Sequence, residues 1–327
     1  MKNILILFAA LILLSCAPKI STEVMMPAKS PDATKLRRVI VFPFQGNYGK
    51  NATPAVENVL SSVYISGERY FTLLDRENLN KLMKEQKFQM SAADMDTIVR
   101  FGKLIGAEGI YTGTANSKVD GNRYFEQRTR CSKSGKSCWE VKVACLRKTA
   151  ELVLEPKLVN VSTSEIMYAD SIMRKAEDSK CDDDSYALMS DNELKNKVFT
   201  EAIDEFRKNV APYGLTMKLE IMTDTDGITD NEARNMLKVG VEFAEAGRID
   251  RACDIWSHGY TANPSSLSLT YNMGLCQEVS GNFSEALGLY QKADSLTSKP
   301  NKMIGLALTR VSEMMQNSNA LMEQMHP

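Results

Sequence analysis

The sequence predicts two domains: a mixed sheet domain with packed helices, of the α/β or α+β class, and an all-α helical repeat domain after it. Between residues 36 and 222, short apolar runs alternate with amphipathic segments, which is the pattern of a sheet covered by helices. From residue 231 to residue 327 the pattern is helical and recurs every 34 residues. The first 35 residues follow neither pattern.

The chain begins like a signal peptide. Lys2 is followed by an apolar run from Ile4 to Leu14, which is too short to span a bilayer and suits a signal-peptide core. The next residues, Leu13-Leu14-Ser15-Cys16, resemble the lipobox of bacterial lipoproteins, in which the cysteine is diacylated and becomes the first residue. The resemblance implies a signal peptide over residues 1–15 and a lipid anchor at Cys16. An ordinary secretory signal with a chance cysteine is the alternative.

The residues after Cys16 bear on location. Ala17 stands where an aspartate would favour the inner membrane, so the resemblance implies the outer membrane, with the chain on its periplasmic face. Residues 16–35 are rich in Pro, Lys, Ser and Thr, and this composition predicts a lipidated flexible tether.

The sheet domain is predicted over residues 36–222. Its expected elements in order are strand 39–44, helix 51–65, strand 71–74, a helix capped by Asp75, helix 92–104, strand 109–113, extended runs 124–130, 139–146 and 150–161, strand 165–169, helix 191–209 and strand 215–222. A β-α-β-α-β start followed by antiparallel strands indicates helices packed on a sheet.

Five motifs, in order along this domain, resemble the curli production assembly/transport lipoprotein family (CsgG-like). They are Val-Ile-Val-Phe-Pro-Phe at 39–44, Arg-Tyr-Phe-Thr-Leu-Leu-Asp-Arg at 69–76, Glu85-Gln86, Gly106-Ala107 with Gly113, and Leu-Val-Asn-Val-Ser-Thr-Ser-Glu-Ile at 158–166. The resemblance implies the fold of the sheet domain. It also implies a relation to secretion channels, whose protomers insert β-hairpins at places matching residues 121–150 and 170–195.

Residues 231–327 contain a 34-residue repeat. Gly240 and Gly274, Gly247 and Gly281, Ala252 and Ala286, and Trp256 and Tyr290 are each 34 positions apart. This period resembles tetratricopeptide repeats, and a further helix over 303–315 is expected to cap the stack. The resemblance implies a concave partner-binding groove. The residues expected to line it, with packing as the alternative for the apolar ones, are Arg234, Leu237, Val241, Tyr271, Asn272, Leu275 and Glu278.

The cysteine count favours disulfides. Outside the cytosol, an even number of cysteines indicates disulfides before metal. Cys131 and Cys138 flank a polar, glycine-containing turn, and we expect them to be bridged. Cys145 and Cys181 are either a second pair or free thiols, and the pairing of the remaining two, Cys253 and Cys276, is open. The six-residue gaps between the first three cysteines do not match zinc-site spacing, so no metal site is predicted.

The sequence contains none of the common motifs for catalysis or cofactor binding. The chain has two histidines, His258 and His326, and no Ser-His-Asp, His-Glu-x-x-His or phosphate-loop pattern. Gly135-Lys136-Ser137 lacks the upstream glycine of a phosphate loop, and Asp182-Asp183-Asp184 is typical of a solvated loop rather than a Ca²⁺ site. A net charge of −1 gives no basic excess for nucleic acid. We therefore expect no enzyme and no cofactor.

The sequence thus predicts a non-enzymatic outer-membrane lipoprotein that acts as a periplasmic interaction or assembly module of the cell envelope. Its partners would be the membrane, through the lipid, and an envelope protein or peptide; a homo-oligomer stays open. The alternative is a subunit of a curli-type secretion channel. Against it stand charges at the places of the membrane hairpins, each costing about 2–4 kcal/mol at mid-bilayer. They are Glu126, Arg128, Arg130, Arg174, Lys175, Glu177 and Asp178.

Overall fold

The computed structural model of the chain describes residues 18–74 and 95–325. The predicted lipidation site Cys16 and the helix expected after Asp75 lie outside these ranges. The chain forms two compact units. We call Pro27–Tyr213 with the residues from Glu323 onward the sheet unit, and Gly214–Met322 with the residues up to Met26 the helical unit. This confirms the predicted fold class, a mixed sheet domain followed by an all-helical region.

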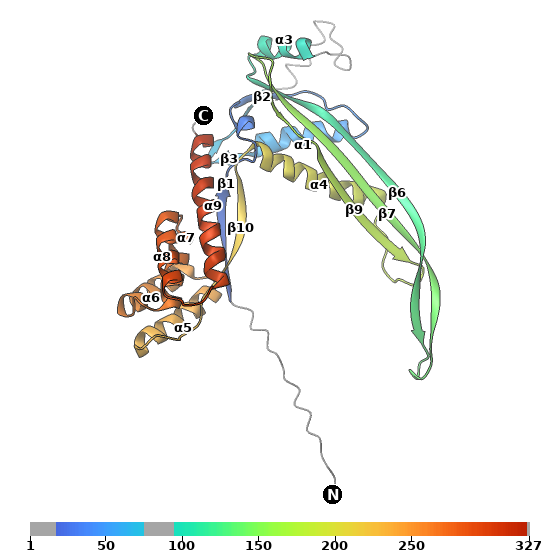
Figure 1. Ribbon diagram of the computed structural model, residues 1–327. Coiled ribbons are helices and arrows are strands. Elements are labelled where there is room, and N and C mark those ends of the chain that lie inside the picture. Colours follow the sequence, from blue (N-terminus) through green and yellow to red (C-terminus); the bar gives the residue numbers. More distant parts are fainter. Residues whose placement is uncertain (1–17, 75–94, 326–327) are drawn as a thin grey trace. The chain divides into compact units, whose positions relative to one another are not determined.

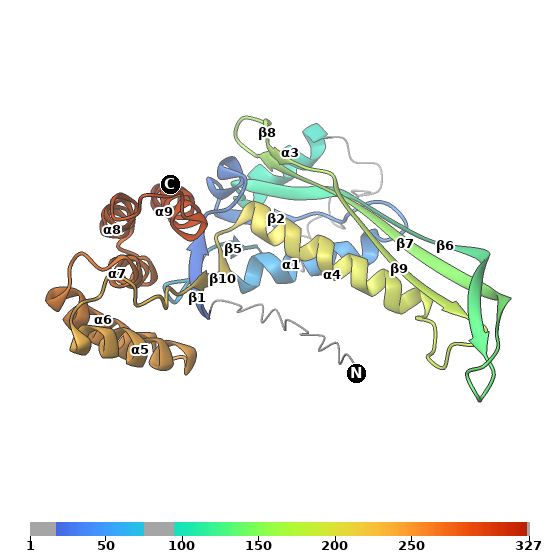
Figure 2. The ribbon, with the colours of Figure 1, turned by 60° about the horizontal axis from the view of Figure 1, so that its bottom comes forward.

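The sheet unit is built on a six-stranded mixed sheet (Figures 1 and 2). Strand β2 (Arg38–Val41) runs parallel to β5 (Thr72–Leu73) on one side and to β6 (Gly109–Cys131) on the other. Strand β7 (Cys138–Asn160) pairs antiparallel with β6 and, further on, with β8 (Ile166–Ala169) and β9 (Ile172–Cys181). A small antiparallel pair, β3 (Tyr64–Ile65) and β4 (Glu68–Arg69), lies outside this sheet.

Helices cover both faces of the sheet. On one face, α1 (Gly49–Ser62) and α4 (Asp191–Val210) bury Val56, Leu60 and Phe206 against strand residues such as Leu152 and Leu154. On the other face, α3 (Met95–Ile105) packs through Phe101. Helix α4 begins at the predicted residue because Ser190 and Glu193 form a reciprocal capping box, which satisfies two free backbone N–H groups.

The helical unit contains the predicted repeat. Its helices are α5 (Asn231–Glu245), α6 (Ile249–Ala262), α7 (Leu267–Val279), α8 (Phe283–Ser295) and α9 (Lys302–Met325). A Cβ on Gly240 would lie 2.2 Å from the Trp256 ring nitrogen, and a Cβ on Gly274 would lie 2.8 Å from the Tyr290 ring. Each glycine thus makes room for the aromatic ring of the next helix, as the 34-residue spacing predicts. None of the helices in the described ranges is long and apolar enough to cross a membrane.

The prediction of a flexible tether over residues 16–35 is wrong for most of that segment. Lys19–Met26 is strand β1, which pairs with β10 (Tyr213–Glu220), and Pro31–Thr34 is a 3-10 helix with Ala33 and Thr34 buried. Half of the residues of β1 are polar, but its side chains alternate in burial and Ile20 reaches the core of the helical unit. Such alternation indicates a half-buried strand.

The boundaries of the predicted domains also move. Most of β10 belongs to the helical unit rather than to the sheet domain predicted over residues 36–222, because Leu219 and Ile221 pack in the helical core. The three extended runs predicted over 124–161 are parts of two continuous strands, β6 and β7. Strand β9 was not predicted, since charged side chains occur on both of its faces.

Candidate functional site: a disulfide-linked arm

The candidate site is the end of the β6–β7 hairpin that contains the turn, where no helix packs on the two strands in Figure 1. The two strands pair at every position from Gly109 with Asn160 to Cys131 with Cys138. Strand β9 accompanies β7 only as far as Cys145, and Figure 1 shows β6 and β7 continuing beyond it. We call this end of the hairpin, together with the last positions paired with β9 at its base, the arm (residues 122–147).

A two-stranded ribbon is marginally stable by itself, and disulfides brace this one. Cys131 is bonded to Cys138 at the tip, and Cys145 is bonded to Cys181 where β9 ends. In the chain-entropy description, closing loops with sequence separations of 7 and 36 residues stabilises the fold by about 2.5 and about 4 kcal/mol. The structure thus pairs both sets of cysteines named from the sequence. A third bond, Cys253 to Cys276, joins α6 to α7.

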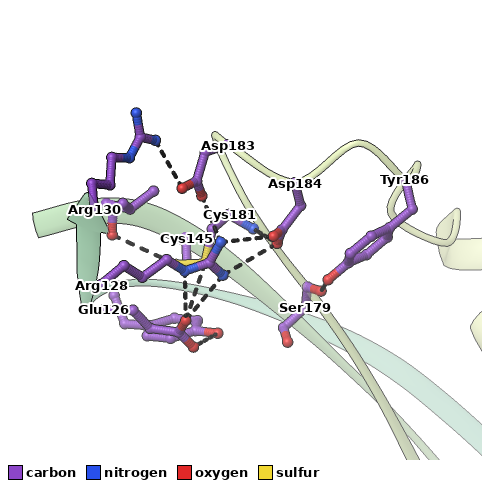
Figure 3. A network of polar contacts seen from close by, with 11 residues as sticks. Glu126, Arg128, Arg130, Cys145, Ser179, Cys181, Asp183, Asp184 and Tyr186 are labelled. Carbon is purple, nitrogen blue, oxygen red and sulfur yellow. Dashed lines mark hydrogen bonds and ion pairs between the residues drawn. A yellow bond between two sulfur atoms is a disulfide. The ribbon is translucent and has the colours of Figure 1, made fainter. Parts of the chain in front are cut away.

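Charged side chains add a second brace (Figure 3). The Arg128 guanidinium donates to Asp183 at 2.6 Å and to Asp184 at 2.8 Å, and it also contacts Glu126 at 3.1 Å. Arg130 donates to the second oxygen of Asp183 at 2.9 Å. Asp183 and Asp184, which follow β9, therefore hold the arm and are not a free solvated loop. Arg128 and Arg130 are two residues apart, which places both side chains on one face of a strand. This spacing is the sequence signal that would have indicated their pairing with the aspartates.

The electrostatics of the network favour its charged form. Hydrogen bonds from Arg128, and next from the Cys181 backbone N–H at 2.7 Å, lower the pKa of Asp184 to about 2. The hydrogen bond to Asp184 is in turn the largest cause that raises the pKa of Arg128. Both groups stay charged across the physiological range.

The other face of the arm carries a shallow pocket of about 630 Å³. Side chains of directly paired residues point to the same face, so Arg123, Phe125, Leu146 and Lys180 share one face of the ribbon. Leu188, from the turn before α4, adds to the lining. We call this the arm pocket; its most exposed apolar side chain is Phe125, at 71%.

Three side chains of a kind that can bind metal lie close together at the base of the arm. Glu126, Cys145 and Cys181 bring their oxygen and sulfur atoms within 4.8 Å of one another. Both sulfurs are in a disulfide, and metal coordination requires thiolates. These three residues therefore do not form a metal centre as they stand.

The groove predicted in the repeats is occupied by the chain itself. Asn272 holds Met222, accepting from its N–H at 3.0 Å and donating to its carbonyl at 2.9 Å. The Glu278 carboxylate accepts from the Tyr290 hydroxyl and from Arg310 on α9. Of the seven residues named from the sequence, Arg234 and Val241 are half-buried. The remaining five are buried and are Leu237, Tyr271, Asn272, Leu275 and Glu278.

These five side chains are therefore not open to a partner. Asn272 is held by Met222 and Glu278 by Arg310 of α9, and Leu237, Tyr271 and Leu275 lie in the core of the helical unit. Met222 and Arg310 are the residues that sequence reasoning missed here. Met222 contacts a residue 50 positions away, and Arg310 contacts one 32 positions away. The repeat period does not predict either contact.

The family described as "Curli production assembly/transport component CsgG" matches residues 31–209, and a domain of unknown function (DUF6340) matches residues 238–323. No curated protein matches the chain.

Among solved structures, the LpoB C-terminal domain from Salmonella enterica is 14% identical, with a TM-score of 0.27, over 45% of this chain and 95% of that chain. Lipoprotein GNA1162 from Neisseria meningitidis is 9% identical, with a TM-score of 0.23, over 52% of this chain and 97% of that chain. The family match covers more than half of the 327 residues. The chain belongs to the family of the curli production assembly/transport component CsgG.

Proposed function

We propose that this protein is a non-enzymatic lipoprotein, anchored through Cys16 to the periplasmic face of the outer membrane, that recruits an envelope partner through its arm. Membership of the CsgG family supports an envelope lipoprotein, and the Leu-Leu-Ser-Cys sequence supports the anchor. The structure of the arm supports the recruiting role.

The single observation that carries the proposal is that the arm is built firmly and yet left uncovered. Two disulfides and the Arg128 network fix it, while Phe125 and Trp139 remain 71% and 50% exposed. Ordered aromatic side chains on a preorganised surface lose little entropy when a partner binds. The repeat groove, by contrast, is filled by the chain itself.

The charge of the arm indicates the chemistry of the partner. Residues 122–147 contain seven Lys and Arg against two Glu, a net charge of +5, in a chain whose net charge is −1. Asp183 and Asp184, which pair with Arg128 and Arg130, offset two of these charges and leave +3. Three of these cations, Lys133, Lys136 and Lys142, are exposed near the tip. An acidic protein surface is the partner that such a patch attracts.

A second candidate is a subunit of a curli-type secretion channel. The hairpin at residues 121–150 favours it, since the place of the first membrane hairpin is occupied by two long strands. The second place, residues 170–195, contains β9, a turn and the start of α4. Both faces of the arm are charged, with Arg123 and Lys142 opposite to Arg128 and Arg130, and each such charge costs about 2–4 kcal/mol at mid-bilayer.

Site-specific photo-crosslinking in intact cells tests the recruiting role. A photoreactive residue at Trp139 should give a discrete adduct with an envelope protein of acidic surface. The matched control is Ile166, which is similarly exposed at 56% but lies at the start of β8, away from the arm. Equal adducts from both positions, or none from Trp139, would contradict recruitment through the arm.

A further inference from the structure

The outer edge of β6 is unpaired along the arm. Strand β6 pairs with β2 only at its start, Gly109–Tyr111, and residues 45–48 then accompany it as far as Ser117. From Lys118 to Cys131, no other strand of the described residues pairs with this edge. An edge of this length, without proline or bulge, is a template for another strand.

The backbone groups that face outward can be identified. Asn47 binds both backbone groups of Ser117, and the Ala115 N–H and carbonyl pair with Gln45 and Tyr48. In an antiparallel ladder, the residues that point away from the partner strand alternate, and the β6–β7 register has no shift. The outward groups on the open edge therefore belong to the odd-numbered residues from 119 to 131.

This edge is complementary to a second copy of itself. In antiparallel pairing with Phe125 opposite Phe125 of the other copy, Arg123 faces Gln127, Asn122 faces Arg128, and Asp120 faces Arg130. Odd residues face odd residues, so the outward N–H and carbonyl groups meet. No like charges are opposed, whereas centring the pair one residue earlier sets Arg130 against Lys118, and one residue later sets Glu126 against Glu126.

The length of the edge fits the same register. With Phe125 at the centre, Lys118 lies opposite Ser132 of the other copy, so the open edge of each chain ends where the turn of the other begins. Asn47 binds β6 at Ser117. In this register, both residues lie beyond the end of the other copy's strand, so they do not block the pairing.

We propose that the protein forms a two-fold dimer by antiparallel pairing of the open edges of β6, centred on Phe125. Directly opposed residues share a face, so both arm pockets lie on the same side of one four-stranded ribbon and the two Phe125 rings pack together. The dimer goes beyond the recruiting role and does not depend on it: recruitment through Trp139 can fail while the edges pair, and the reverse.

Cysteines introduced one at a time into the full-length chain, with its native disulfides kept, test the pairing and its register. Phe125→Cys should form an intermolecular disulfide in intact cells, seen as a dimer on a non-reducing gel and located by peptide mapping. Gln127→Cys is the matched control on the same face. Its two copies would be four residues out of register, about 14 Å apart, so its dimer yield should be at least roughly tenfold lower, because a disulfide needs Cα atoms within about 7 Å.

A second experiment, with two variants expressed together, tests the register if Phe125→Cys does not fold. Coexpressed Arg123→Cys and Gln127→Cys chains should crosslink to each other, while neither should crosslink to itself. Equal yields at Phe125 and Gln127, no dimer from any of these chains, crosslinking to a different protein, or a ladder of larger species would overturn the two-fold pairing.

Discussion

At the scale of single residues, Glu278 shows how a predicted binding residue became a core residue. Its carboxylate is 1% exposed and accepts from the Tyr290 hydroxyl at 2.7 Å and from Arg310 at 2.6 and 2.8 Å. Glu278→Ala would leave a partly buried guanidinium unpaired, so we expect a loss of about 3–5 kcal/mol in the free energy of unfolding. The matched control Asp250→Ala breaks the exposed pair with Arg248 and should cost about 1 kcal/mol or less. Urea unfolding of both variants distinguishes the two, and equal costs would contradict the assignment of Glu278 to the core.

Asp184 provides a pH test at the same scale. Because its pKa is lowered to about 2 from an ordinary value of 3.8, its contacts stabilise the fold above pH 3.8 and are lost as the pH falls through 2. The carboxyl chemical shift of Asp184 should therefore titrate near pH 2, and in Arg128→Gln its midpoint should rise toward 3.8. Loss of Arg128 removes the largest cause of the shift. A midpoint that is the same in the variant would mean that Arg128 does not hold this residue.

At the scale of elements, the tip disulfide should control the order of the arm. We expect the paired variant Cys131→Ala/Cys138→Ala to exchange its arm amides faster in hydrogen-exchange mass spectrometry, because the local opening free energy falls by up to about 2.5 kcal/mol. The amides of α4, which pack in the core through Val198 and Phe206, should exchange unchanged. Faster exchange throughout the sheet unit would show that the bond supports the whole fold and not the arm alone.

Elements with local signals were predicted well from the sequence, and elements fixed by distant contacts were not. Helix α4 has its own cap at Ser190, and the helix pairs have a strict 34-residue period. Strand β9 buries Ile172 and Ala176 only because α4 lies over them, and β1 is a strand because it pairs with β10. The same holds for the arm. Cys131 and Cys138, on either side of a short turn, predicted a hairpin, but the partners of Arg128 could not be predicted because they follow β9, which the sequence did not reveal.

At the scale of the whole molecule, the proposed location depends on Cys16. We expect Cys16→Ala to move the protein from the membrane pellet to the soluble fraction, because the two acyl chains that hold a lipoprotein on a bilayer would be absent. Fractionation followed by immunoblotting measures this, with the paired variant Cys131→Ala/Cys138→Ala as a cysteine control that keeps the lipobox and leaves no free thiol. A Cys16→Ala protein that still pellets like the unaltered chain would remove the anchor from the account.

The central claim, that the arm is a protein-binding element in the aqueous periplasm and not a membrane hairpin, is tested most directly by the fluorescence of Trp139. The chain has two tryptophans; Trp139 is 50% exposed on the arm and Trp256 is fully buried, so Trp139→Phe gives the background. In proteoliposomes of the lipidated protein, we predict that aqueous acrylamide quenches Trp139 and that brominated lipid does not. Strong quenching by brominated lipid, with protection from acrylamide, would contradict the claim and place the arm in the bilayer.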